Sequence, residues 1–169
     1  MRTHRLDFAE FYREVKNECL LTVLVSVGDR DTAQDLVDEA FARAWASWRT
    51  VSRHPAPAAW VVRTALNAGI SRWRRRRREV PVPDLALVAD RPAGGGGAGG
   101  PVDPRIMAAL LRLPVRQRQV VALRLFLDLD TAGTAQVLGI APGTVQAHLG
   151  RAMAALRDDL IPTRQENQS

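Results

Sequence analysis

Residues 131–156 have the sequence TAGTAQVLGIAPGTVQAHLGRAMAAL, which decides the fold of the second half of the chain. Ala135 is a small residue where two crossing helices can approach, and Gly139 can adopt the positive φ that a tight turn requires. Pro142 presets the backbone of the first turn of a second helix. Val145, six residues after the glycine, is placed to pack that helix back on the first. The spacing therefore predicts a helix-turn-helix.

The opposite face of its second helix would carry polar side chains that can reach base edges and phosphates in a major groove. These candidate DNA-binding residues are Thr144, Gln146, His148 and Arg151. A plain helical hairpin without a DNA role would show the same spacing. The composition favours DNA, because 24 Lys+Arg against 18 Asp+Glu give the chain a net charge of +6. All of these basic residues except Lys16 are arginines, which pair with phosphate in a bidentate manner.

The same composition argues against several other classes of protein. The single cysteine, Cys19, excludes a disulfide framework and a cysteine-rich zinc site, so no metal and no cofactor are expected. No apolar run approaches the roughly 20 residues that a membrane helix needs, and no signal peptide is evident. We therefore expect a soluble, cytoplasmic protein without membrane insertion that binds an anionic partner.

Helical periodicity dominates the chain and no segment alternates with period two, so we predict an all-α protein. A Pro- and Gly-rich stretch divides it into two small helical domains joined by a flexible linker. The expected divisions are a first domain at 1–79, the linker at 80–104, a second domain at 105–162 and a disordered tail at 163–169. The expected helices are 8–27, 31–48, 58–79, 105–113, 116–127, 131–138 and 142–160.

The second expected helix has apolar residues at steps of three and one from Ala33 to Trp48, which predicts a single buried stripe that includes Trp45. Asp31 and Gln34 have the spacing of a capping box at its start. Asp35, Asp38 and Glu39 would share one face away from the stripe. This acidic face could be an ordinary solvated surface or a docking surface for a basic partner helix.

The third expected helix ends in a run of arginines, RWRRRRR at residues 72–78. Five consecutive arginines repel one another unless phosphates neutralise them, so nucleic-acid binding is the direct interpretation. A solvated tail and a membrane-surface patch are the alternatives. Trp60, Asn67 and Trp73 lie among the arginines and could support unstacked bases, as in single-strand binding sites.

In their order along the chain, these motifs resemble the extracytoplasmic-function (ECF) sigma factors, the small two-domain specificity subunits of bacterial RNA polymerase. The matching segments are DLVDEAFARAW (35–45), AWVVRTALNAGISRWRRRRRE (59–79), LPVRQRQVVALRLFLDL (113–129) and VLGIAPGTVQAHLGRAMAALR (137–157). The resemblance is greatest to the actinobacterial sigma-E-like subfamily.

The resemblance implies a role for each site. The acidic residues Asp35, Asp38 and Glu39 would bind the β′ clamp of core RNA polymerase, with the β subunit as a further contact. Residues 50–58 would capture a flipped base of the −10 promoter element. The −10 element would also be contacted by Arg63, Asn67, Ser71, Arg72, Arg74 and Arg75, and the −35 element by the helix-turn-helix residues named above. An anti-sigma factor is a further expected partner.

The chain departs from the family in the recognition helix. Gln146-Ala147-His148 stands where Lys-Ser-Arg is frequent, so we expect a weak phosphate contribution at −35. Ala141 replaces the usual Ser cap. A stand-alone helix-turn-helix regulator remains the alternative, although it would need neither the linker nor the acidic helix. An enzyme such as a nuclease would need a carboxylate cluster or a phosphate loop, so no enzymatic activity is expected.

Overall fold

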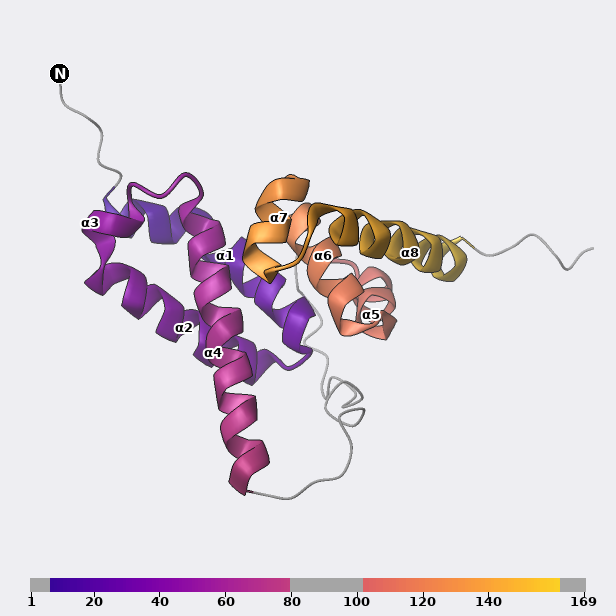
Figure 1. Cartoon of the computed structure of the whole chain (residues 1–169), viewed down its shortest axis with the longest axis horizontal. Helices are drawn as coiled ribbons and strands as arrows, with labels where there is room; N and C mark the ends of the chain where they lie inside the picture. The colour runs from indigo at the N-terminus through magenta and orange to yellow at the C-terminus, as the bar shows by residue number, and fades with distance from the viewer. Residues whose placement is uncertain (1–6, 80–101, 162–169) are drawn as a thin grey trace, which may run out of the picture.

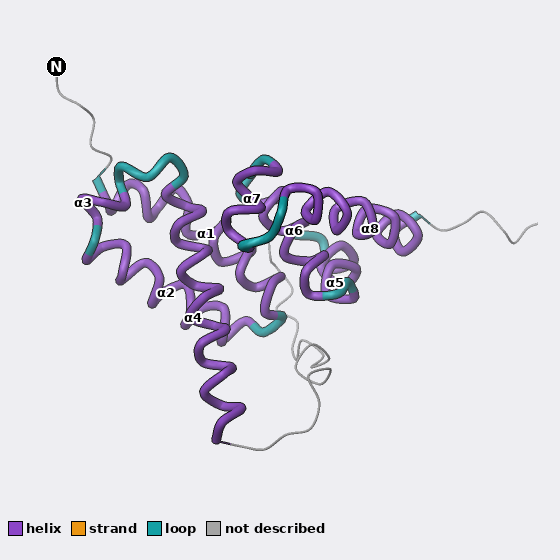
Figure 2. Tube along the Cα trace, viewed as in Figure 1, coloured by secondary structure: helices purple, strands orange, loops and turns teal. Residues whose placement is uncertain are grey.

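The structure is a computed structural model that describes residues 7–79 and 102–161, and within these ranges it contains helices and no strands (Figures 1 and 2). The predicted all-α fold is confirmed. The predicted linker and C-terminal tail fall largely on residues 80–101 and 162–169, outside the described part of the chain. The helices are α1 (Phe8–Val27), α2 (Arg30–Ala46), α3 (Trp48–Val51), α4 (Pro57–Glu79), α5 (Pro104–Arg112), α6 (Val115–Phe126), α7 (Thr131–Leu138) and α8 (Pro142–Leu160).

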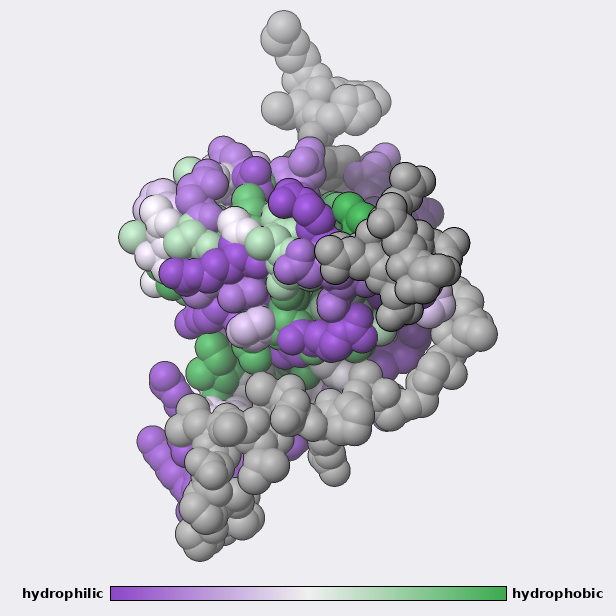
Figure 3. Space-filling view, turned by 90° about the vertical axis from the view of Figure 1, so that its right-hand side faces the viewer, coloured by the Kyte–Doolittle hydropathy of each residue, from purple (hydrophilic) through white to green (hydrophobic). Residues whose placement is uncertain are grey.

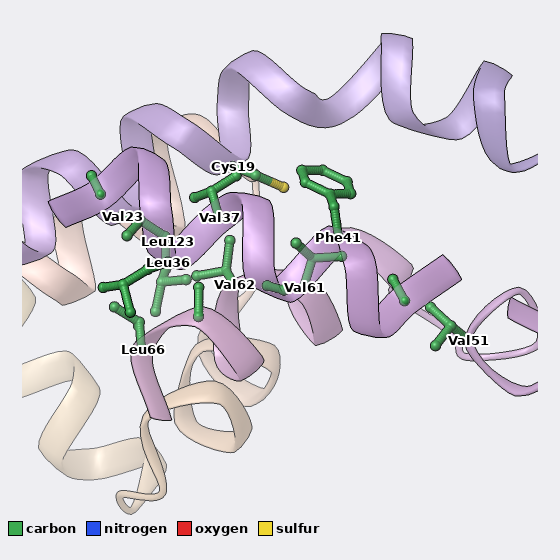
Figure 4. Packing of buried hydrophobic residues seen from close by; sticks show 14 of the residues in the cluster. Cys19, Val23, Leu36, Val37, Phe41, Val51, Val61, Val62, Leu66 and Leu123 are labelled. Carbon is green, nitrogen blue, oxygen red and sulfur yellow. The ribbon is translucent and has the colours of Figure 1, made fainter. Parts of the chain in front are cut away.

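The N-terminal domain consists of α1 to α4, and α1, α2 and α4 pack against one another around an apolar core. Leu36 of α2 and Val62 of α4 are fully buried there (Figure 4). Burial of such side chains stabilises a fold by about 1.5–3 kcal/mol each. Helix α1 ends at Gly28, which has the left-handed φ of +79° that favours glycine.

The start of α2 differs from the sequence prediction. The N-cap is Asp29 rather than Asp31, and its carboxylate accepts hydrogen bonds from the Thr32 backbone N–H at 2.9 Å and from the Thr32 hydroxyl at 2.5 Å. Asp29 is two residues earlier in the sequence and therefore reaches the free amides of the first turn. The capping-box prediction is wrong in its register.

Trp45 also differs from the prediction, because its side chain is 63% exposed rather than buried. Its neighbour Ala44 takes the buried position, and adjacent helical residues point about 100° apart. The Trp45 ring instead lies edge-on against Phe8, with 5.1 Å between ring centroids.

The C-terminal domain consists of α5 to α8 and contains the predicted helix-turn-helix in α7 and α8. Gly139 has φ of +64° and ends α7, and its N–H donates to the Ala135 carbonyl. Val145 is fully buried with Ala135 and Val120 in a small cluster between the helices. Ala141 is the N-cap of α8 and makes no side-chain cap bond, as its replacement of serine implies.

The two domains pack directly on each other, which the sequence did not indicate. Helix α6 lies against α1, and α7 lies against α4 (Figure 1). Leu123 of α6 is fully buried in the core of the N-terminal domain, beside residues of α1, α2 and α4 (Figure 4). In this structure the described parts of both domains therefore form one body.

Candidate nucleic-acid interface

Helix α4 carries a polar and basic face directed to solvent. Arg63, Asn67, Ser71, Arg74 and Arg78 are all exposed, and they follow one another at steps of four, four, three and four residues. With 3.6 residues per turn these steps place the five side chains on one side of the helix. We call these five residues the basic face of α4. Such a face can contact the phosphates and bases of a DNA strand.

Four of the six predicted −10 residues belong to this face, namely Arg63, Asn67, Ser71 and Arg74. Arg75 is exposed and borders it. Arg78 completes the face; it belongs to the arginine run predicted to bind nucleic acid but not to the predicted −10 residues, although its step of four from Arg74 was a usable signal.

Arg72 lies on a different side of α4, toward α2. Its Nη2 donates to Glu39 Oε2 at 2.5 Å, and its side chain is 37% exposed. The structure therefore does not bring Arg72 together with the other predicted −10 residues, because the helical period turns it toward the neighbouring helix.

The three residues of the predicted acidic site also point in two different directions. Asp35 and Asp38 are exposed on one side of α2, and Asp38 accepts a hydrogen bond from Gln34 at 2.9 Å. Glu39 is turned toward α4, where it binds Arg72, and its other oxygen accepts from Arg43 at 2.6 Å. We call Asp35 and Asp38 the acidic surface of α2. A basic partner can reach these two carboxylates without displacing any ion pair among the described residues.

The predicted −35 residues in the first turns of α8 differ in their exposure to solvent. Thr144, Gln146 and Arg151 are exposed, whereas His148 is only half-exposed and its Nδ1 is buried without a hydrogen-bond partner. The Gln146 amide donates to the Thr131 hydroxyl at 2.8 Å, which ties it to the start of α7. Arg151 is thus the one predicted −35 residue that combines a positive charge with an exposed side chain.

Small residues occupy the middle of the exposed side of α8. Gly143, Ala147 and Gly150 are exposed at steps of four and three residues, and no heavy atom lies within 4 Å of a Cβ placed at either glycine. A helix with so few side-chain atoms on this side can lie with its backbone close to a bound surface. This row of small residues was not predicted from the sequence.

The segment between α3 and α4 is exposed and polar at its tip. Arg53, His54 and Pro55 are exposed, and the Ala56 N–H donates to His54 Nδ1 at 3.0 Å. This bond fixes the histidine ring against its own turn. The predicted −10 loop thus has a hydrogen bond of its own at its tip.

The tryptophans of α4 are less available than the sequence suggested. Trp60 and Trp73 are both half-buried, and the Arg77 guanidinium covers the Trp73 ring at 4.6 Å from the centroid. This is a cation–π contact, which a base stacking on the same ring face would have to displace.

Arg118 is buried, unlike the exposed arginines of α4. Arg118 of α6 is 5% exposed at the boundary between the domains, and its Nη1 donates to the Leu111 carbonyl at 3.2 Å while its Nε has no partner. The same Nη1 lies 4.0 Å from a Cβ placed on Gly28 at the end of α1. Burial lowers the pKa of Arg118 from its ordinary value.

The described residues contain no cluster of three or more His, Cys, Asp and Glu that could hold a metal ion. Over the same ranges, each helix is too short or too polar to span a bilayer.

Comparison with known proteins defines the class to which this fold and these surfaces belong. Residues 8–79 match Sigma-70 region 2, and residues 104–156 match Sigma-70, region 4. These are two helical regions of RNA polymerase sigma factors, in the order that the sequence predicted.

Similar proteins show which family of sigma factors the chain belongs to. The chain is 32% identical over 157 residues to the RNA polymerase sigma-E factor of Streptomyces coelicolor, covering 92% of this chain and 87% of that protein. It is 33% identical over 151 residues to the ECF RNA polymerase sigma factor SigM of Mycobacterium tuberculosis, covering 88% and 72%. The chain belongs to the ECF family of RNA polymerase sigma factors, and it is similar to actinobacterial sigma-E members.

A solved structure shares the arrangement of the helices. The sigma factor RpoE of Bartonella quintana, in complex with the anti-sigma factor NepR, superposes with a TM-score of 0.71 at 25% identity, covering 92% of this chain and 99% of that one.

Proposed function

We propose that this chain is the promoter-specificity subunit of a bacterial RNA polymerase. It binds core polymerase through the acidic surface of α2, contacts the −10 element through the basic face of α4 and the segment after α3, and contacts the −35 element through α8. It promotes DNA opening by binding an unstacked base, so it acts by binding rather than catalysis. Its site of action is the cytoplasm, where core polymerase and promoter DNA are found.

The observation that carries this proposal is the division of charge between two packed helices. Helix α2 exposes Asp35 and Asp38, whereas α4, packed against it, exposes Arg63 and Arg74. One small domain thus offers an acidic surface to a protein and a basic surface to DNA. A stand-alone regulator that binds only DNA would have no use for the first surface.

Promoter recognition by both domains requires them to separate. The −10 and −35 elements are centred about 25 base pairs apart, which at 3.4 Å per base pair is about 85 Å. Helices in contact have axes about 8–10 Å apart, and here α7 contacts α4 directly. We infer that the packed form described above is not the form that binds both promoter elements, and that assembly with polymerase opens it.

The Bartonella relative is held in a complex with an anti-sigma factor. We propose that an anti-sigma factor is also a candidate partner of this chain.

The experiment that tests the proposal is co-purification with core RNA polymerase. Asp35→Arg with Asp38→Arg reverses the acidic surface, and both side chains are exposed, so the fold should survive. We expect the variant to lose core polymerase while its circular dichroism spectrum stays unchanged.

The matched control is Glu10→Arg with Glu14→Arg, which makes the same charge change on an exposed side of α1. It should retain core polymerase. Equal retention by both double variants would show that the acidic surface of α2 is only solvated, and the proposed polymerase contact would be wrong.

A further inference from the structure

Glu39 is engaged differently from the other acidic residues near it. Its Oε2 accepts from Arg72 of α4 at 2.5 Å, and its Oε1 accepts from Arg43 of its own helix at 2.6 Å. Its side chain is 31% exposed. Asp35 and Asp38 are exposed on the acidic surface and take part in no ion pair among the described residues. Glu39 therefore connects two helices.

Arg72 lies where α4 leaves the body of the domain. One turn before it, Gly69 lets α2 approach so closely that Leu36 Cδ1 would lie 3.2 Å from a Cβ at that position. After Arg72, no residue of the described stretch 73–78 is buried. Figure 1 shows the last turns of α4 extending beyond the other helices. The Glu39–Arg72 pair thus lies at the base of the projecting, arginine-rich end.

We propose that Glu39 is a positioning residue, which fixes the arginine-rich end of α4 to α2 and so sets the direction of the basic face relative to the acidic surface. This inference rests on the proposed function, in which α2 contacts polymerase and α4 contacts DNA. The ion pair then determines where promoter DNA lies on the polymerase. Glu39 itself need not touch polymerase, contrary to the role that the family resemblance implies for it.

The physical basis is geometric rather than energetic. Ion pairs with this degree of exposure add little to stability, and the apolar contacts of Leu36, Val62 and Leu66 keep α2 and α4 packed without it. The pair acts on orientation because a guanidinium held at a carboxylate has few alternative positions. Because the arginines after Arg72 all lie on one projecting stretch of helix, a change in the direction of that stretch moves them together.

A charge exchange tests the proposal in assembled holoenzyme on promoter DNA. Glu39→Arg and Arg72→Glu should each lower promoter-dependent transcription by roughly tenfold, with co-purified core polymerase unchanged. The double variant Glu39→Arg with Arg72→Glu should restore most of that transcription, because a carboxylate on α4 can then pair with a guanidinium on α2. Asp35→Arg is the matched control, and it should lose core polymerase without rescue by Arg72→Glu.

A second readout does not depend on transcription. Spin labels at Ala42→Cys and Arg76→Cys, both exposed sites on α2 and α4, report the distance between the two helices in the complete chain, and the buried Cys19 is shielded from labelling. We expect a narrow distance distribution in the parent protein, a broad one in Glu39→Arg, and a narrow one again in the charge exchange.

Three results would overturn the proposal. They are loss of core polymerase in Glu39→Arg, an unchanged distance distribution in that variant, and failure of the charge exchange to restore transcription. The first would assign Glu39 to the polymerase contact, and the last would make Arg72 a direct DNA contact. If the parent protein itself neither binds polymerase nor starts transcription, the proposed function fails, while the distance measurement still decides whether Glu39 positions α4.

Discussion

Leu123 of the C-terminal domain and Leu36 of the N-terminal domain are both fully buried in one hydrophobic cluster (Figure 4). Two half-buried residues of the C-terminal domain pack against the same cluster: Leu129, just before α7, and Val137, near the end of α7. The contact between the domains is therefore mainly apolar, so its strength should depend little on salt concentration. The described residues visible in Figure 3 include both hydrophilic side chains and apolar patches.

Val137→Asp should open the two domains, because it places a charge against this shared cluster. Val137 does not belong to the cluster of Val120, Ala135 and Val145 that holds the helix-turn-helix together, so α7 and α8 should stay folded. Small-angle X-ray scattering should give a larger radius of gyration with an unchanged helical content. Gln136→Asp, at an exposed site on the same helix, should leave the radius unchanged. Equal radii for the two variants would show that α7 does not help to close the molecule.

The salt dependence of promoter binding should distinguish the basic face of α4 from its other arginines. Arg74→Gln with Arg78→Gln removes two charges from that face, so the log–log salt slope of holoenzyme binding should fall by about 1.8, at about 0.9 for each lost phosphate contact. Arg75→Gln with Arg76→Gln removes the same charge outside the face and should change the slope less. Identical slopes for the two pairs would mean that only the total charge matters.

Two glycines of the helix-turn-helix should respond to alanine in opposite directions. Gly150 is inside α8 with no atom within 4 Å of a new Cβ, so Gly150→Ala should raise the free energy of unfolding by about 0.5–1 kcal/mol. Gly139 has φ of +64°, so Gly139→Ala should lower the free energy of unfolding by about 1–2 kcal/mol. Urea unfolding measures both. A stabilising Gly139→Ala would contradict the left-handed turn.

Cys19 should make the protein less stable at alkaline pH. Burial raises the pKa of its thiol from the ordinary 9.0 to about 12, with a smaller contribution from Glu18. The unfolded chain therefore loses this proton first, and the stabilisation is complete below pH 9 and declines as the pH rises toward 12. Between about pH 7 and pH 10.5 the decline should reach about 2 kcal/mol.

Cys19→Ala is the control for this alkaline effect. All other side chains are the same in both proteins, so their contributions cancel in the comparison. The gap in free energy of unfolding between the parent and Cys19→Ala should narrow above about pH 9. A gap that stays constant to about pH 10.5 would show that the thiol is not shielded.

The sequence predicted α1, α2 and α4 to α8 because each has a regular helical period, but it did not predict the short α3 (Trp48–Val51), whose residues it assigned to the end of α2 and a turn. The bounds of α7 and α8 agree residue for residue, since Gly139 and Pro142 mark a stop and a start that few other residues could supply. Periodicity failed at Trp45, where it could not decide which of two adjacent apolar residues faces the core. It also misplaced the cap of α2, because Asp29 and Asp31 are equally suitable as residue types.

The arrangement of the site was only partly predictable. The five members of the basic face of α4 lie on one helix, so their shared side follows from spacing. The Glu39–Arg72 pair joins residues 33 positions apart on two helices, and its formation depends on how α2 crosses α4. The packing of α6 on α1 likewise depends on how distant helices come together, which spacing along the chain does not indicate. The sequence predicted two helical domains joined by a flexible linker but gave no sign that Leu123 lies in a core that the two domains share.

Run-off transcription with purified core RNA polymerase shows whether this protein directs polymerase to promoters. Fragments of genomic DNA would be transcribed with core polymerase alone, with added parent protein, and with the Asp35→Arg, Asp38→Arg variant. We expect a set of RNA 5′ ends that appear only with the parent protein and are preceded by shared −35 and −10 sequences. RNA 5′ ends that are the same in all three reactions would contradict it.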